Sequence, residues 1–165
     1  MKRLFVIMGK TVLTVGIILA VVPYSRDAIA NSWRLHHFRG SLTSLPHLPG
    51  TSRVCVFSEV ALFRGNSNHC DYFIAEIRTY SGPKSAIKSH YAPLRIDNPI
   101  TKKKEKVDII FFAGGRVLDP EVWWWPLYGF EDISAWNIPA GSENLSMYAL
   151  AVFNMYDANW DIRCH

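Results

Sequence analysis

Three cysteines carry the clearest covalent chemistry in this chain: Cys55, Cys70 and Cys164. Three thiols permit at most one intramolecular disulfide and leave one thiol over. If the strand that starts at Cys70 runs antiparallel to the last strand of the chain, Cys70 and Cys164 meet. Cys55 would lie several positions down the neighbouring strand, too far for the short Cα–Cα distance that a bridge allows. We therefore predict a Cys70–Cys164 disulfide, with Cys55 as a buried apolar side chain on its strand.

An aromatic cluster offers a second kind of chemistry, recognition by stacking. In an extended segment Trp123 and Trp125 project to one side and Trp124 to the other. An exposed Trp presents a large rigid apolar face with a polar N–H, which suits sugars, cations or partner proteins. The sequence thus predicts Trp123, Trp125 and Tyr128 as ligand-contact residues for a protein or glycan partner. The alternative is that these rings pack in an aromatic-rich core.

Catalytic and metal-binding patterns are weak in this chain. It contains no phosphate-binding glycine loop, nucleophile elbow, zinc-binding His-Glu pair or Cys-x-x-Cys motif. His36, His37 and His47 do not form a ligand pattern, because adjacent histidines of an extended segment point opposite ways and no Cys or carboxylate follows at a suitable spacing. A catalytic pairing of Cys55 with His90 lacks an activating neighbour. The sequence therefore assigns no catalytic residue, metal ligand or cofactor, and leans against an enzyme.

Residues 1–30 are typical of a segment that directs export. Lys2, Arg3 and Lys10 form a basic start, Thr11–Val22 is an uncharged apolar run, and the small residues of Ala28-Ile29-Ala30 fit a signal-peptidase site. The early positive charges stay on the cytoplasmic side, so the rest of the chain faces outward. We expect an exported protein, periplasmic or extracellular, in which a disulfide can persist.

Two readings of this segment stay open. The run Thr11–Val22 has twelve residues, which suits a cleaved signal and is too short to span about 30 Å of hydrocarbon. Leu4–Val22 has nineteen residues and could span as an uncleaved anchor, with Lys10 snorkelling to the headgroups. The sequence favours cleavage, since Pro23 would end the helix where a signal peptide's polar region begins. Only an uncleaved segment would contact the membrane.

Most of the chain's basic character belongs to this segment. The whole chain has a net charge of +4, whereas residues 31–165 carry 14 basic and 13 acidic side chains. The one dense run, Lys102–Lys106, is typical of a solvated loop. We therefore expect no nucleic-acid partner.

The remaining pattern predicts one α+β domain at residues 53–165, after a polar lead-in at 31–52 that we expect to be an extended tether. We expect a mostly antiparallel sheet of about five to seven strands with one short helix packed on it. The segments with the clearest signals are strands at 53–63 and 70–80 that form a hairpin, a helix at 84–91 with Ile87 and Tyr91 on its packed face, a strand at 107–113 followed by a Gly114-Gly115 turn, and a last strand at 145–155.

These features predict a small exported or membrane-anchored binding module of the cell envelope or extracellular space. The alternative is a small exported hydrolase whose catalytic carboxylates, or a Cys and His, are dispersed along the sequence.

Overall fold

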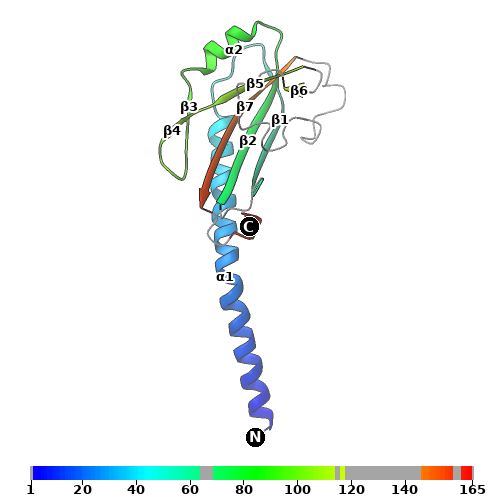
Figure 1. The fold of residues 1–165 in the computed structure, drawn as a ribbon, viewed down its shortest axis with the longest axis vertical. Helices are drawn as coiled ribbons and strands as arrows, with labels where there is room; N and C mark the ends of the chain where they lie inside the picture. Colours follow the sequence, from blue (N-terminus) through cyan, green and yellow to red (C-terminus); the bar gives the residue numbers. More distant parts are fainter. Residues whose placement is uncertain (1, 64–68, 114–115, 118–145, 158–160, 165) are drawn as a thin grey trace.

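The computed structural model describes residues 2–63, 69–113, 116–117, 146–157 and 161–164, with the side chains of 2–20, 23, 24, 113, 116 and 117 left out. Within these residues the fold is α+β, with a long N-terminal helix lying along an antiparallel sheet (Figure 1). This agrees with the fold class expected from the sequence.

Five antiparallel strands form the main sheet, in the order β1-β2-β7-β5-β6. A separate hairpin of two short strands lies beside it. The bounds are β1 Ser52–Ala61, β2 His69–Thr79, β5 Asp108–Ala113, β6 Arg116–Val117 and β7 Met147–Asp157 for the main sheet, and β3 Arg95–Asp97 and β4 Lys104–Lys106 for the hairpin.

The register confirms the two pairings that the sequence predicted. β1 and β2 form an antiparallel hairpin in which Val60 lies opposite Tyr72. The last strand, β7, runs antiparallel to β2 and places Tyr156 opposite Cys70. The start of β2 and the end of β7 therefore meet at one end of the sheet, which we call the base of the domain.

Helix α1 spans Lys2–Thr43, so the first part of the expected lead-in is helical. The expectation of an extended polar tether at residues 31–43 is wrong. Leu35, Phe38 and Leu42 are spaced so that they share one side of α1, and Leu45 follows just after the helix. Phe38 and Leu42 are completely buried. This apolar stripe packs on the sheet, while the N-terminal part of α1 extends beyond the base (Figure 1).

Both faces of β2 are buried, as expected for a central strand. Tyr72 and Ile74 face α1, and the alternate residues Phe73, Ala75 and Ile77 belong to a second apolar cluster on the opposite face. Residues of β5 and β7 divide between the two clusters in the same way.

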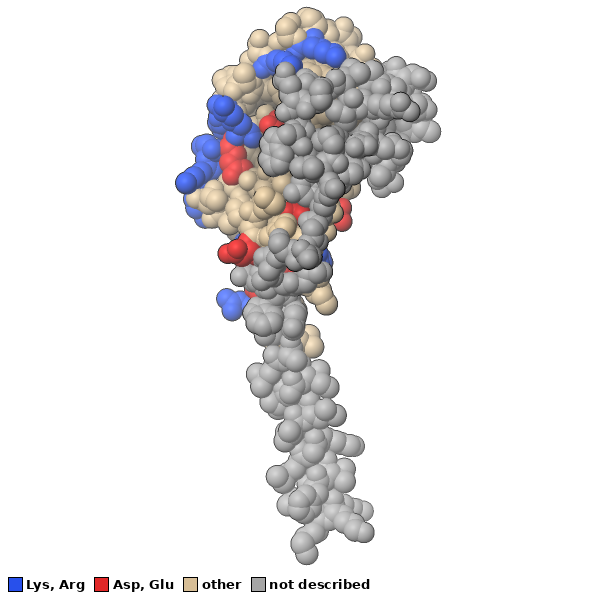
Figure 2. All heavy atoms as spheres, viewed as in Figure 1, with Lys and Arg blue, Asp and Glu red and all other residues tan. Residues whose placement is uncertain are grey.

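The short helix α2, Lys84–Tyr91, occurs where the sequence predicted it, with Ile87 and Tyr91 buried. β5 pairs with β6 across the predicted Gly114-Gly115 turn, whose two residues lie outside the described part. The lysine run, expected to be a plain loop, instead contributes strand β4. It begins at Lys102, whose φ of 60° is unusual for a residue other than glycine. Figure 2 shows Lys and Arg side chains at the α2 end and on the side of the domain that carries β3 and β4, in separate patches.

Candidate functional site

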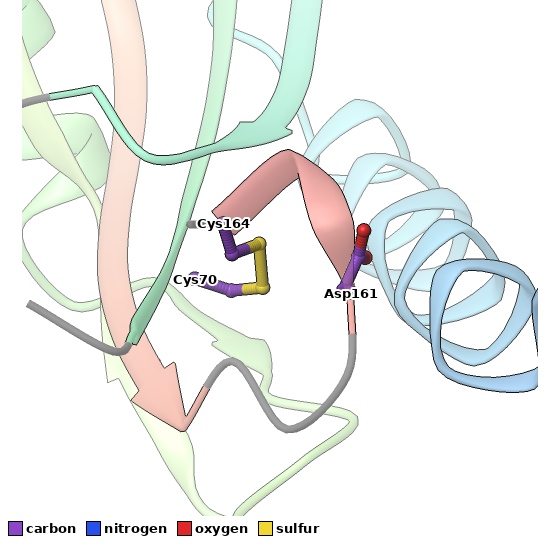
Figure 3. A group of neighbouring side chains, drawn as sticks. All are labelled: Cys70, Asp161 and Cys164. Atoms are coloured by element: carbon purple, nitrogen blue, oxygen red, sulfur yellow. A yellow bond between two sulfur atoms is a disulfide. The ribbon is translucent and has the colours of Figure 1, made fainter. Parts of the chain in front are cut away.

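The C-terminal segment meets α1 at the base of the domain, around the predicted disulfide. Cys70 opens β2 and Cys164 lies in the short 3₁₀ helix η4, Ile162–Cys164. Their Sγ atoms are 1.94 Å apart and their Cα atoms 4.9 Å apart, as the sequence led us to expect (Figure 3). Asp161 lies close to both sulfur atoms, and this trio resembles a set of metal ligands. Because both sulfurs are engaged in the disulfide, neither is a thiolate that could bind a metal.

Asp161 is completely buried and is surrounded by donors. Its carboxylate accepts hydrogen bonds from Asn31 Nδ2 at 2.9 Å and from Arg163 Nη2 at 2.6 Å. Burial alone would raise the pKa of Asp161, but the hydrogen bonds from Arg163 and Asn31 together lower it below its ordinary value. Asp161 is therefore a structural carboxylate that stays ionised.

Asn31, on α1, joins this carboxylate to the sheet. Its Oδ1 accepts from the Tyr72 hydroxyl at 2.6 Å and from Arg34 Nη1 at 2.9 Å, and its Nδ2 lies 3.3 Å from Cys70 Sγ. With the disulfide, Asp161 and Arg163, these residues form what we call the base cluster. The cluster ties three segments together: α1, the start of β2 and η4.

Arg163 extends the base cluster along α1. Its Nη2 donates to the carbonyl oxygen of Ala28 at 2.8 Å, and its Nη1 donates to Ser32 Oγ at 3.1 Å. The folded domain thus holds residues on both sides of the Ala30–Asn31 bond, where the sequence suggested cleavage.

A second group of buried charges lies at the other end of the docked part of α1. Glu76 on β2 has no exposed side-chain surface and contacts Arg53, Arg78 and His47. Arg53 Nε lies 3.0 Å from the carboxylate, and Arg53 also donates to the carbonyl oxygen of Thr43 at the end of α1. A carboxylate buried this deeply is stabilised only if its charge and lone pairs are matched.

His47 contacts Glu76 without a hydrogen bond to it and begins a chain of hydrogen bonds to two tyrosines. Its Nε2 lies 3.5 Å from Glu76, and its Nδ1 lies 3.3 Å from the hydroxyl of Tyr91, which in turn is 3.0 Å from that of Tyr148. Burial lowers the pKa of His47, although the charge of Glu76 opposes this effect. Burial and the hydrogen bond to Tyr148 raise the pKa of Tyr91. We call Glu76, Arg53, Arg78, His47, Tyr91 and Tyr148 the upper cluster.

Asp71 is a third buried carboxylate, at the start of β2. It accepts the backbone N–H of Phe63 at 3.0 Å and lies 3.1 Å from His69 Nε2. Burial raises the pKa of Asp71, and these contacts oppose the shift. Asp71 thus connects the residues that follow β1 to the start of β2.

A surface hollow of about 310 Å³ lies between the outer side of α1 and the β3–β4 hairpin. Trp33 and His37 line it from the helix, with ring centroids 4.0 Å apart, and Asp97, Asn98 and Lys102 line it from the hairpin. An exposed indole beside polar groups suits ligand contact by stacking. This hollow combines an exposed Trp with the charged side chains of Asp97 and Lys102.

The other residues singled out from the sequence have varied positions. Trp123, Trp125 and Tyr128 lie outside the described residues. His36 and His37 are neighbours on α1, whereas His47 belongs to the upper cluster. Cys55, half-buried on β1, packs on the face of the sheet opposite α1, while His90 Nε2 lies 2.8 Å from the carbonyl oxygen of Pro46.

Sequence reasoning did not identify Asn31, Asp161 or Glu76 as members of buried clusters. Asp161 and Arg163 stand close to Cys164 in the sequence, which was the available signal for the base cluster. Glu76 offered no such signal, because its partners come from separate segments that only the fold brings together.

Comparison with protein-family models, curated proteins and solved structures found no match to this chain. In the part whose side chains are described, which begins at Val21, no helix is long and apolar enough to cross a membrane.

Proposed function

We propose that this chain is an exported interaction domain held at a membrane by the uncleaved N-terminal part of α1. The observation that carries the proposal is the pair of contacts that Arg163 makes across the expected cleavage position, to Ala28 and to Ser32. Cleavage after Ala30 would remove one of these partners and would place a new charged terminus at the buried Asn31. The fold therefore favours an intact helix over a severed one.

A continuous helix also suits the mechanical role of an anchor. The apolar run Thr11–Val22 and the packed stripe of Phe38 and Leu42 belong to the same helix, so no flexible joint separates a membrane segment from the domain core. The disulfide adds a covalent link between η4 and β2, and such bonds persist in oxidising compartments outside the cytoplasm. Both features support a domain presented at a fixed position above a membrane.

The interaction role rests on the aromatic residues that the sequence places close together. We propose that Trp123, Trp125 and Tyr128 contact a protein or glycan partner. Replacing Trp123 and Trp125 by Ala should abolish partner capture while the thermal unfolding midpoint stays close to that of the wild type. Unchanged capture by this variant would refute the assignment.

Alkaline carbonate extraction of cells that express the full chain tests the anchor. We expect the protein in the membrane pellet, with its domain accessible to protease added from outside the membrane. Recovery of the wild-type chain in the supernatant would contradict the proposal.

A matched pair of variants at Ile17 sharpens this test. Ile17→Lys places a charge in the middle of the apolar run, which costs about 2.5 to 3.5 kcal/mol on insertion scales and should reduce membrane retention. Ile17→Leu keeps the run apolar and should behave as the wild type. Equal retention of the two variants would show that this segment is not what holds the protein.

A further inference from the structure

Several large apolar side chains at the base of the domain are exposed although the core nearby is well packed. Ile29 on α1 is 69% exposed, Trp33 on α1 is 56% exposed and Ile162 on η4 is 71% exposed. Val21 and Val22, further down α1, are also exposed. Exposed apolar side chains that gather in one place mark a contact with another apolar phase or molecule.

These side chains are continuous with the apolar run of the same helix. Val22 and Ile29 are seven residues apart and Trp33 is four residues beyond Ile29, so all three share one side of α1. That side points away from the stripe of Phe38 and Leu42 that packs on the sheet. The apolar surface therefore continues past Val22 to the level of the domain.

The C-terminal segment reaches the same level. Arg163 bonds to Ala28 and Ser32, which fixes η4 beside this turn of α1. Ile162, which precedes Arg163, is therefore exposed at about the height of Ile29.

The length of a membrane span then distinguishes two positions for the bilayer. A span that ends at Val22 must take in Lys10 and leaves Ile29, Trp33 and Ile162 in water. A span of twenty residues, 11–30, covers about 30 Å, which is the thickness of the hydrocarbon core. In this second position Lys10 lies at the cytoplasmic boundary, and Ile29 and Ile162 lie at the outer one.

The second position also accommodates the remaining residues. Trp33 lies three residues above Ala30, about 4.5 Å, inside a headgroup layer of about 5 to 8 Å where Trp is enriched. Arg26 lies about 6 Å inside the outer boundary, from which its long side chain can snorkel to the headgroups, and Asp27 lies one residue nearer that boundary.

Resting on the proposed anchor, we propose that the base of the domain sits in the outer headgroup layer of a phospholipid bilayer, with Ile29, Ile162 and Trp33 as its lipid contacts. In this arrangement the domain itself contacts lipid in addition to being attached through its helix. These contacts fix the distance of the domain from the bilayer.

Spin labels at single cysteines test this position. The background is Cys55→Ser with the Cys70–Cys164 disulfide intact, checked by mass under non-reducing conditions, in the full chain reconstituted into phosphatidylcholine and phosphatidylglycerol vesicles. Ile29→Cys and Trp33→Cys report on the proposed contact. Ser44→Cys, exposed near the end of the docked helix and about 21 Å above Ala30, is the matched control.

The ratio of accessibility to oxygen over that to a water-soluble nickel complex reports depth. We expect a ratio several-fold higher at position 29 than at position 44, with position 33 between them. Equal aqueous values at all three positions, in protein that floats with the vesicles, would overturn the proposed seating and leave the anchor in place. Protein that does not float with the vesicles would overturn both proposals.

Discussion

The docked part of α1 is held at its two ends by different physical means. At the base cluster a disulfide and a neutral amide, Asn31, connect the helix, β2 and η4 around an ion pair between the buried Asp161 and the exposed Arg163. At the upper cluster there is no covalent link, and one buried carboxylate, Glu76, has three basic side chains around it.

The two ends of the docked helix differ in whether a covalent bond stabilises them. The base cluster contains η4, which the disulfide fixes to β2 and which Arg163 joins to α1. The upper cluster lies where α1, β1, β2, α2 and β7 converge, and the charge of Glu76 is balanced there by non-covalent ion pairs. The base cluster should respond to reduction of the disulfide, and the upper cluster to loss of charge balance.

Removal of the disulfide should have the largest effect. Cys70 and Cys164 are separated by 94 residues, and a loop of that size contributes about 4 to 5 kcal/mol in the chain-entropy model. The double variant with Ser at both positions should lose about this much unfolding free energy, measured by urea denaturation in detergent. Cys55→Ser is the control and should change it little. If the double variant were as stable as this control, the disulfide would not contribute to the stability of the domain.

Neutralising Glu76 should have the next largest effect. Glu76→Gln leaves the mostly buried Arg78 without its counterion, and breaking a buried pair costs about 3 to 5 kcal/mol. Glu59→Gln, on an exposed position of β1, should change the unfolding free energy by less than about 0.5 kcal/mol. Equal losses in the two variants would contradict the central place of Glu76 in the upper cluster.

Truncation of Asn31 should have a smaller effect at the base. Asn31→Ala removes the acceptor of the buried Tyr72 hydroxyl and one donor to Asp161, which costs about 1 to 3 kcal/mol. His36→Ala, exposed on the same helix, is the matched control for lost helical side chains. A loss no greater than that of the control would mean that Asn31 does not connect α1 to the sheet.

The smallest effect concerns pH at the upper cluster. Because burial lowers the pKa of His47 below its ordinary value of 6.5, the unfolded chain binds this proton more readily than the folded one. The resulting stability is fully present above about pH 6.5 and is lost as the pH falls through the lowered pKa. His47→Gln should flatten this part of the stability curve relative to the wild type, and His36→Gln should not. If the unfolding free energy of His47→Gln and of the wild type changed equally with pH, His47 would not be the group responsible.

Local signals were enough to predict much of the fold. The β-branched and aromatic run before Ala61, the turn residues that follow it and the positions of Cys70 and Cys164 predicted the β1–β2 hairpin and the disulfide partners. The pairing of Ile87 with Tyr91 at helical spacing predicted α2 and its packed face. In each of these cases the deciding residues are close in sequence or lie at the ends of elements.

The docked half of α1 was missed because its signal is sparse. Phe38 and Leu42 stand at helical spacing, but they are separated by Arg39, Gly40 and Ser41, and Pro46 follows closely. Glu76 was missed for a different reason. Its neighbours Ile74 and Arg78 indicate a strand, but its counterions come from positions that depend on the register of β1 and on the path of the chain after α1.

The proposed anchor requires α1 to remain one continuous helix from its N-terminal part to the domain core. Intact-mass measurement of the protein isolated from its cells, with the disulfide preserved, tests this claim most directly. We expect a mass that includes residues 2–30. A mass that corresponds to a chain starting at Asn31 would contradict it.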